Sequence, residues 1–345
     1  MAPAQNLLQL LQSRTIVDCD TMDVEVPKTL GNFVDCTSNQ AIAFFELQKP
    51  VHKSTIEDSI SLAKTLSSKF PEVPVTELAV EIAMVKLQLA ISYHVSGFVH
   101  VQTNPYYSYD TQKTISNARR IVQLFKYLDS AFDTSRACIK IPSTWEGLQA
   151  CRVLQSTGTD TLATTLFTLE QAALAGEVGC HYIAPYVNEL KVHFEPGFVL
   201  LPGAPAPLSI RVFIDPSRFI DHNKAQRLCL QAQRLYEEHG FKTQVLPASL
   251  TSTDEIMALA GVPHITIAPG LLKALAEAPA SSLSTRSLFD EAESKAQPFV
   301  SYKDDEAGYR MAFTRSGNGE GERKLNQAIN IFCDMQDKME AIMSQ

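Results

Sequence analysis

The sequence predicts an α/β protein that folds as a single (β/α)8 TIM-type barrel, with an extra helix at the N-terminus and another at the C-terminus. Short apolar and β-branched runs alternate about eight times with longer stretches of helical periodicity. Such alternation is typical of parallel βαβ units, and eight of them close into a barrel. No Gly-x-Gly-x-x-Gly motif follows a predicted strand, which disfavours the alternative, an open doubly wound sheet.

Length and composition agree with this prediction. The chain has 345 residues, of which 45% are hydrophobic, and barrels commonly run to such lengths as one domain. We therefore expect residues 1–345 to form one domain. The formal net charge of −8, without a clustered basic stripe, argues against a nucleic-acid partner.

No targeting, membrane or metal-binding segment is expected. The sequence has no long apolar run that could span a membrane, no signal-peptide pattern at its start and no retention tag at its end. The seven cysteines form no Cys-x-x-Cys motif, as expected of free thiols in a reduced, cytoplasmic protein. The eight histidines are dispersed without a zinc-binding spacing, so we predict no metal site.

The strands and helices follow one another along the chain. Strands are expected at residues 15–21, 32–39, 97–102, 138–142, 161–167, 180–187, 242–246 and 264–268, with an extra one at 209–214. Helices are expected at residues 5–12, 40–47, 54–70, from 76 onward, 111–132, 143–155, 169–178, 216–239, 253–260, 269–277 and 322–344.

Local sequence signals support several of these boundaries. Ser54 with Glu57 predicts a capping box, and Thr76 predicts a helix cap. Gly240 is a suitable residue to end the helix before it. We predict loops at 195–208 and 278–321, in which the glycines of 316–321 form a turn rather than a phosphate cradle.

One lysine inside a predicted strand is a candidate catalytic residue. Lys140 lies between two isoleucines, and Pro142 ends the apolar run. Ser143, with Glu146 three residues later, predicts that a helix follows at once. Because buried lysines are uncommon, an amine at the mouth of a barrel indicates Schiff-base chemistry with a ketone or aldehyde. The ordinary alternative is that Lys140 reaches solvent at the strand end.

The other candidate site residues also close predicted strands, because barrel active sites lie at the carboxyl ends of the strands. Each of these residues also has an ordinary explanation, such as turn formation, helix capping or packing. With Lys140, they are Asp20, Asn39, Gln102, Thr164, Tyr186 and Ser249.

Three motifs resemble the transaldolases, which are class I aldolases on an (α/β)8 barrel. The segment Lys-Ile-Pro-Ser-Thr-Trp-Glu-Gly at 140–147 resembles their Schiff-base lysine segment. The motifs at 18–23 and 35–39 resemble their Asp-Thr-x-Asp and Asp-Ala-Thr-Thr-Asn. The likeness covers most of the chain and is weakest at 190–235 and 280–320. It implies that Lys140 forms the Schiff base and that Asp20 is the general acid/base, without a cofactor.

Some positions depart from the transaldolase pattern. Gln102 stands where transaldolases carry a glutamate, Tyr186 where they usually carry phenylalanine, and Ala184 where they carry serine. These residues resemble the fructose-6-phosphate aldolase branch, in which the tyrosine acts as acid/base. The resemblance implies that Thr164, Gln102 and Tyr186 hold a catalytic water, and that Asn39 bonds a substrate hydroxyl or orients the lysine.

The substrate-binding positions depart further. Glu189 and Thr251 stand where the family holds a sugar phosphate with arginines, and Leu162 replaces an asparagine, although Ser249 is retained. Each charge-assisted hydrogen bond is worth about 1.5–3 kcal/mol, so these losses disfavour phosphate. We therefore expect a small, uncharged or cationic carbonyl substrate. Glu189 would select a cationic group or, alternatively, lie solvated on the surface.

Three functions remain compatible with the sequence. We favour a Schiff-base aldolase that makes, cleaves or transfers a C–C bond on a non-phosphorylated carbonyl compound. The first alternative is a pentose-phosphate transaldolase that transfers dihydroxyacetone between sugar phosphates, and the second is an inactive scaffold. A homodimer is one assembly that the sequence leaves open. The sequence also does not determine whether another arginine restores the phosphate site, the candidates being Arg211, Arg218, Arg310 and Arg315.

Overall fold

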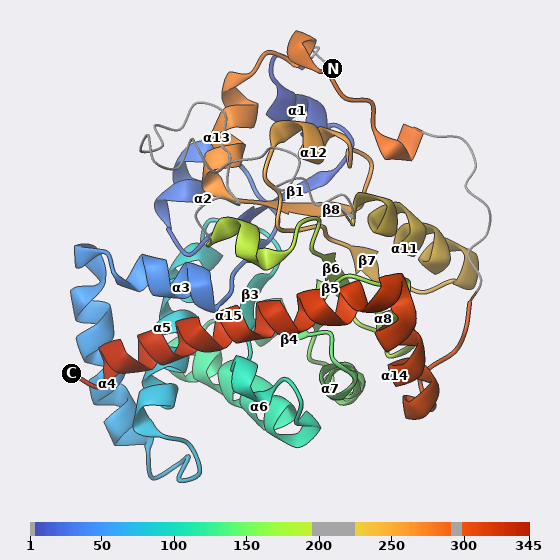
Figure 1. Cartoon of the computed structure of the whole chain (residues 1–345). Coiled ribbons are helices and arrows are strands. Elements are labelled where there is room, and N and C mark those ends of the chain that lie inside the picture. The colour runs from blue at the N-terminus through green and yellow to red at the C-terminus, as the bar shows by residue number, and fades with distance from the viewer. Residues whose placement is uncertain (1–3, 195–224, 291–298) are drawn as a thin grey trace, which may run out of the picture.

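Eight parallel strands form a single sheet in the computed structural model, which describes residues 4–194, 225–290 and 299–345 (Figure 1). Neighbours follow the order β7-β6-β5-β4-β3-β2-β1-β8. The amide of Thr266 on β8 donates to the carbonyl of Pro247, just after β7, so the two edges meet and close the barrel. The strands are Ile16–Asp20 (β1), Cys36–Thr37 (β2), Val99–Gln102 (β3), Ala137–Pro142 (β4), Thr161–Leu166 (β5), Tyr182–Pro185 (β6), Gln244–Val245 (β7) and His264–Ile267 (β8).

Helices pack around this barrel and confirm the predicted (β/α)8 fold, while the open-sheet alternative is wrong. The α-helices are Leu7–Gln12 (α1), Glu25–Leu30 (α2), Gln40–Leu47 (α3), Lys53–Leu66 (α4), Val75–Ser92 (α5), Thr111–Leu128 (α6), Trp145–Ser156 (α7), Leu169–Glu177 (α8), Gln226–His239 (α11), Thr253–Met257 (α12), Pro269–Glu277 (α13), Glu306–Arg315 (α14) and Glu320–Met343 (α15). Short 3-10 turns lie at Pro50–His52 (η1), Pro105–Tyr107 (η2), Thr134–Arg136 (η3), Leu190–His193 (η4), Ala280–Ser282 (η5), Leu288–Asp290 (η6) and Ser316–Gly319 (η7).

Because helices cover the outside of the sheet, most strands are buried on both faces. Every residue of β3, β4, β5, β6 and β8 is buried. The residues of one strand alternate between the barrel interior and the helical layer, so positions two apart share a face. The cysteines of β1, β2 and β4 are fully buried free thiols, as the sequence predicted.

The last helix, α15, runs across the molecule in Figure 1 and contacts α3, α5, η4 and β5. Side-chain bonds fasten it along its length. Glu189 bonds Arg323 at 2.9 Å, Tyr106 donates to Asp337 at 2.8 Å, and Thr76 donates to Glu340 at 3.1 Å. This helix therefore joins segments that are far apart in the sequence.

Several predicted helix boundaries need correction. No side chain caps α4 or α5, which begin at Lys53 and Val75, so the capping roles of Ser54 and Thr76 are wrong. The cap of α7 is Thr144, whose hydroxyl accepts from the amide of Gly147 at 2.8 Å, rather than Ser143. Ser143 instead donates to the carbonyl of Thr164, which ties the end of β4 to β5.

Two helices were not predicted, and three predictions fall on positions that the structure does not describe. The short helix α2 contains a proline, and α14 lies in the predicted loop-rich tail. The predicted loop at 195–208, the predicted strand at 209–214 and the residues 216–224 of a predicted helix lie outside the described residues. Gly240 ends α11 with a φ of 67°, as predicted, and the glycines at 317 and 319 form the turn between α14 and α15.

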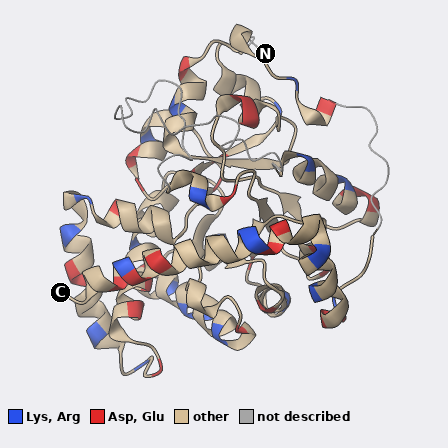
Figure 2. Ribbon diagram, viewed as in Figure 1, with Lys and Arg blue, Asp and Glu red and all other residues tan. Residues whose placement is uncertain are grey.

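Charged residues are distributed without an evident division of the molecule by sign. Figure 2 shows basic and acidic residues interspersed along α15 and the outer helices. Among the helices that the structure describes, none is long and apolar enough to cross a membrane.

Candidate active site

Four predicted site residues lie together at the carboxyl ends of β3 to β6. Gln102 is the register partner of Lys140, and Thr164 is the partner of Pro142, the residue that shares the face of Lys140. Tyr186 directly follows β6 and forms a bridge to Ala248. The barrel therefore gathers the lysine, the amide, the hydroxyl and the phenol that the sequence nominated.

The Lys140 side chain is enclosed, with only 2% of the residue exposed. Its Nζ lies 5.8 Å from the ring centroid of Tyr186. Within the described part of the chain, no carboxylate forms an ion pair with it. The alternative that Lys140 reaches solvent at the strand end is thus wrong, and its amine faces an aromatic ring rather than a counter-ion.

Beside the lysine, buried polar atoms lack partners. Both amide atoms of Gln102 and the hydroxyl of Thr164 are buried and make no hydrogen bond to any described residue. An unpaired buried polar group costs about 1–3 kcal/mol, so such groups usually bind water or a ligand. The arrangement fits two residues that hold a water molecule next to Lys140.

The backbone is strained near this group. Thr165 and Ser249 have φ values of 53° and 58°, a region that residues other than glycine rarely adopt. The strain at Thr165 coincides with an irregularity in the pairing of β5 with β6, after Ala163. Such strain often marks functional sites, and the sequence gives no signal of it.

Asp20 lies on the same interior face at the end of β1. Its Oδ1 accepts a hydrogen bond from the hydroxyl of Thr37 at 2.7 Å, and Thr37 shares a 2.6 Å bond with Thr266. Because Thr37 donates to the carboxylate, Thr266 is the donor to Thr37. This chain of hydroxyls orients one oxygen of Asp20 and leaves Oδ2 without a partner among the described residues.

Asn39 has a structural role as a helix cap, rather than the turn formation that the sequence kept as its alternative. Its Oδ1 accepts from the amides of Ala41 and Ile42, at 2.9 and 3.0 Å, and so caps α3. No described residue bonds its Nδ2, and the side chain lines the cavity below. Capping therefore fixes the orientation in which Asn39 presents its amide donor.

A cavity of about 510 Å³ opens beside these residues, and Asp20, Asn39, Tyr186 and Ser249 line it. Lys140, Gln102 and Thr164 are buried behind this lining. Several other lining residues were not nominated from the sequence, because only the packing of α3 and η4 brings them together. They include Ile42, Phe45, Lys49, His193 and Phe194.

The charged groups of the cavity are mostly paired within the protein. Lys49 bonds Asp23 at 2.6 Å and Glu46 at 2.8 Å. His193 bonds the hydroxyl of Ser249 at 2.9 Å. Surrounding protein atoms lower the pKa of His193 below its usual value, and the carboxylate of Asp20 only partly opposes this effect. No arginine is among the described lining residues.

The remaining predicted positions lie outside this lining. Glu189 accepts from Arg323 and Gln327, both at 2.9 Å, so its carboxylate is already paired. Thr251 bonds Glu255, and Ala184 is buried in β6. Of the four arginines considered above, Arg310 pairs with Glu146 and Glu306. Arg315 is exposed at the end of α14, and residues 211 and 218 are outside the described part.

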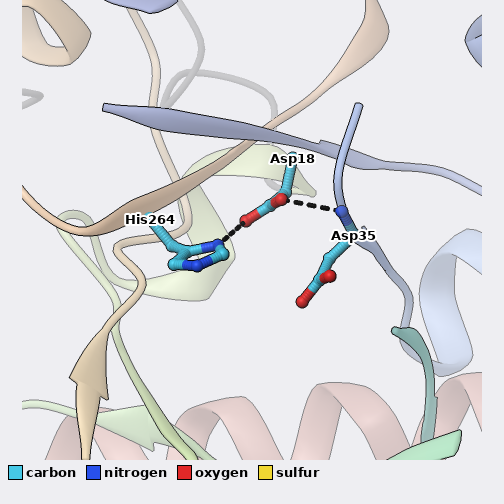
Figure 3. A group of neighbouring side chains, drawn as sticks. All are labelled: Asp18, Asp35 and His264. Carbon is cyan, nitrogen blue, oxygen red and sulfur yellow. Dashed lines mark hydrogen bonds and ion pairs between the residues drawn. The ribbon is translucent and has the colours of Figure 1, made fainter. Parts of the chain in front are cut away.

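A second polar group lies one step deeper in the barrel, on β1 and β8 (Figure 3). The two carboxyl oxygens of Asp18 bond the amide of Asp35 at 2.9 Å and Nδ1 of His264 at 2.8 Å. Burial, aided by Asp35, raises the pKa of Asp18 to about 7 against the opposing effect of His264. The same pairing raises the pKa of His264, although burial acts against it.

Asp35 completes this deeper group. Its oxygens bond the amide of Phe98 at 2.7 Å and Nε2 of His100 at 3.2 Å. Burial would raise the pKa of Asp35, but the bond from His100 lowers it. Asp18, Asp35 and His264 have ligand types and spacing suited to a metal ion, yet every carboxyl oxygen already has a partner. A metal would have to displace these bonds, so we interpret the group as a hydrogen-bonded support of the barrel.

Fold and site together define a class of protein: a (β/α)8-barrel enzyme with a buried lysine at the carboxyl ends of its strands. The model of the transaldolase/fructose-6-phosphate aldolase family matches residues 17–341. The chain belongs to this family, whose members are enzymes of the Schiff-base aldolase class. The predicted resemblance is thus confirmed over nearly the whole chain.

Individual relatives are consistent with this family assignment. A protein named transaldolase from Alteromonas mediterranea is 30% identical over 99% of this chain and 98% of its own length. Transaldolase A from Pasteurella multocida is also 30% identical, over 97% of this chain and 98% of its own. A transaldolase from Glaesserella parasuis is 29% identical over 98% of both chains.

Proposed function

We propose that this enzyme makes, cleaves or transfers a C–C bond on a non-phosphorylated carbonyl compound, through an imine on Lys140. The observation that carries the proposal is the environment of this lysine. Its amine is buried against Tyr186 without a carboxylate partner, next to the unpaired polar atoms of Gln102 and Thr164. An amine so placed is suited to attack a carbonyl rather than to form a structural ion pair.

The reaction begins when the Lys140 amine attacks the carbonyl carbon. The carbonyl oxygen, protonated from Tyr186 through a held water, then leaves as water and gives an iminium ion. The iminium accepts the electron pair of the adjacent C–C bond, while Asp20 takes the proton from the hydroxyl of the departing fragment. In the reverse direction, the resulting enamine attacks an aldehyde. Tyr186 passes protons through a water held by Gln102 and Thr164, and hydrolysis of the imine frees the product.

The charges of the cavity support a substrate without a phosphate group. Asp20, Asp23 and Glu46 give its described lining three carboxylates, against a single lysine that is already paired with two of them. The lowered pKa of His193 disfavours its charged form. A phosphate would therefore meet no free cation among these residues.

Borohydride trapping tests the imine directly. The protein is incubated with dihydroxyacetone, fructose 6-phosphate, or neutral ketones and aldehydes, reduced, and weighed intact. We expect a mass gain with neutral carbonyl compounds that is lost in Lys140→Met and kept in Lys273→Met, a matched exposed lysine on α13. An adduct that persists in Lys140→Met, or no adduct with any compound, would contradict the proposal and favour an inactive scaffold.

The second candidate is a transaldolase that transfers dihydroxyacetone between sugar phosphates. The observation in its favour is that the relatives at about 30% identity reported above bear that name. This candidate predicts trapping and turnover of fructose 6-phosphate at micromolar concentrations. The non-phosphorylated proposal predicts that fructose 6-phosphate requires concentrations at least about 100-fold higher than the best neutral substrate, as expected when two charge-assisted bonds are missing.

A further inference from the structure

We infer that the cavity binds an apolar group about the size of a phenyl ring, so that the substrates are hydrophobic ketones or aldehydes rather than polyhydroxylated ones. This inference rests on the proposed function and adds the substrate class. It is carried by the apolar walls of the cavity, by an exposed phenylalanine at its edge, and by the internal pairing of its polar groups.

The apolar walls come from three parts of the chain. Helix α3 contributes Ile42 and Phe45, and η4 with the residue after it contributes Leu190 and Phe194. The segment after β7 contributes Leu250. Of the 20 described lining residues, 11 are apolar or aromatic. Apolar lining with a few polar groups is the usual composition of a site for a hydrophobic small molecule.

Phe45 is the least expected member of this lining. It is 52% exposed, whereas its neighbour Phe44 is buried in the core. Its ring stacks on that of Phe194, with centroids 6.4 Å apart and planes inclined by 15°. An aromatic pair with one exposed ring, in the lining of a cavity, offers a flat apolar surface, and such surfaces commonly mark binding sites.

The polar groups of the cavity have few free donors for a sugar chain. Lys49 is held by Asp23 and Glu46, and Ser249 bonds His193. Apart from Oδ2 of Asp20 and Nδ2 of Asn39, which no described residue bonds, a chain of several hydroxyls would find few partners here, so part of its bonds to water would be lost at a cost in free energy. An apolar substituent loses nothing of this kind, because it gains from leaving water.

The size of the cavity agrees with this substrate class. Its volume of about 510 Å³ lies within the range typical of sites for drug-sized ligands. A three-carbon ketone would leave most of this volume unfilled. The space lies beyond Tyr186 and Asp20, the two catalytic candidates that also line it. The Tyr186 ring that lines the cavity lies 5.8 Å from the Nζ of Lys140, so a substrate whose carbonyl group reaches this amine past Tyr186 would carry its substituent in the cavity.

Alcohols test the apolar site without imine formation. We would titrate the wild-type protein and Lys140→Met with 2-butanol through 2-octanol and with 4-phenyl-2-butanol, by calorimetry. We expect the dissociation constant to fall about fourfold with each added methylene, in both proteins. A constant that does not change with chain length would overturn the inference.

A substitution of Phe45 tests whether the alcohols bind in this cavity. Phe45→Ala should weaken the binding of 4-phenyl-2-butanol by about tenfold, because the apolar contact with the ring is lost. Met311→Ala is the matched control, since Met311 is an apolar side chain of similar exposure, 62%, on α14 outside the cavity. Equal affinities of Phe45→Ala and Met311→Ala would overturn the assignment of this site.

Trapping then separates the two proposals. With borohydride, 4-phenyl-2-butanone should reach half-saturation of the wild-type protein at a concentration at least about tenfold below that of dihydroxyacetone. The opposite order would overturn the hydrophobic substrate class and leave the imine on Lys140 intact. Alcohol binding that depends on Phe45, without any ketone adduct, would instead contradict the proposed function alone.

Discussion

Two polar layers lie on the interior faces of the same strands, two residues apart, and they differ in how completely their central side chains are paired. In the deeper layer, both carboxyl oxygens of Asp18 have partners, one of them His264. In the layer at the barrel mouth, the polar atoms of Gln102 and Thr164 have none among the described residues, and Lys140 has no counter-ion.

This difference distinguishes side chains that support the barrel from side chains that are free to bind water or substrate. Polar groups that bond one another hold the sheet in register and are not available to a substrate. Polar groups that are buried without partners are costly for the folded protein, so a site that keeps them indicates a use for them in binding water or substrate. Position on the same strand and the same face therefore does not determine the role of a residue.

The largest expected effect is on turnover, and it distinguishes the two aspartates of β1, Asp20 and Asp18. Asp20→Asn should lower turnover of the best carbonyl substrate about 10³-fold, because the proton acceptor is lost. Asp18→Asn, on the same strand and face, should change turnover by less than tenfold. Steady-state kinetics of both variants provide the measurement, and similar losses would mean that the two layers share the chemistry.

The next comparison is between Tyr182 on β6 and Tyr186, which directly follows this strand. Tyr186→Phe should lower kcat about 10²-fold with little change in KM, because the phenol transfers a proton but does not hold the substrate. Tyr182→Phe should retain activity, since the Tyr182 ring packs between His100 and His264 in the deeper layer. Retention of full activity by Tyr186→Phe would remove the phenol from the mechanism.

Stability should change by different amounts in the two layers. Gln102→Met removes an amide whose only proposed partner is a water molecule and replaces it by an apolar chain of similar size, so the free energy of unfolding should change by less than about 1 kcal/mol. His264→Met leaves Asp18 without its partner and should lower that free energy by about 2 kcal/mol. Urea denaturation measures both. A larger loss in Gln102→Met than in His264→Met would show that Gln102 belongs to the structural support of the barrel.

The deeper layer should also give the protein a pH dependence of stability. The pKa of Asp18 is raised to about 7 from 3.8. Between these values the folded protein holds a proton that the unfolded chain lacks, so this group makes stability fall as pH rises from 4 to 7. The raised pKa of His264 acts in the same direction. The slope is at most about 1.4 kcal/mol per pH unit for each group.

Asp18→Asn removes this carboxyl and the pairing that raises the pKa of His264. Its free energy of unfolding should therefore vary less between pH 5 and 7 than that of the wild-type protein, when both are measured by denaturation at several pH values. Parallel profiles would mean that Asp18 and His264 do not exchange protons in this range.

Much of the fold could be predicted from the sequence, because alternation and periodicity are local. The ranges of α3 and α13 agree residue by residue with the prediction. Strands β2 and β7 are only two residues long, because neighbouring segments diverge from the ladder in ways that an apolar run does not encode. The cap of α7 went to Thr144 because Ser143 is occupied by a bond to β5.

The grouping of the candidate site residues was predictable where it depends on strand ends. Lys140, Gln102, Thr164 and Tyr186 close adjacent strands, so barrel closure alone brings them together. Phe45 could not be predicted as part of the site, because its contact with Phe194 joins α3 to a segment about 150 residues later. The pairing of Glu189 with α15 is equally long-range, so its carboxylate could not be recognised as occupied.

Helix α15 has a consequence for synthesis of the enzyme. A ribosome completes β8 before it translates α15, so the eight strands can associate while the segment around η4 still lacks its partner. Glu189 then has no Arg323, and Lys191 lacks the bond from its amide to Gln327. One wall of the cavity is therefore fastened only when translation has reached the last helix.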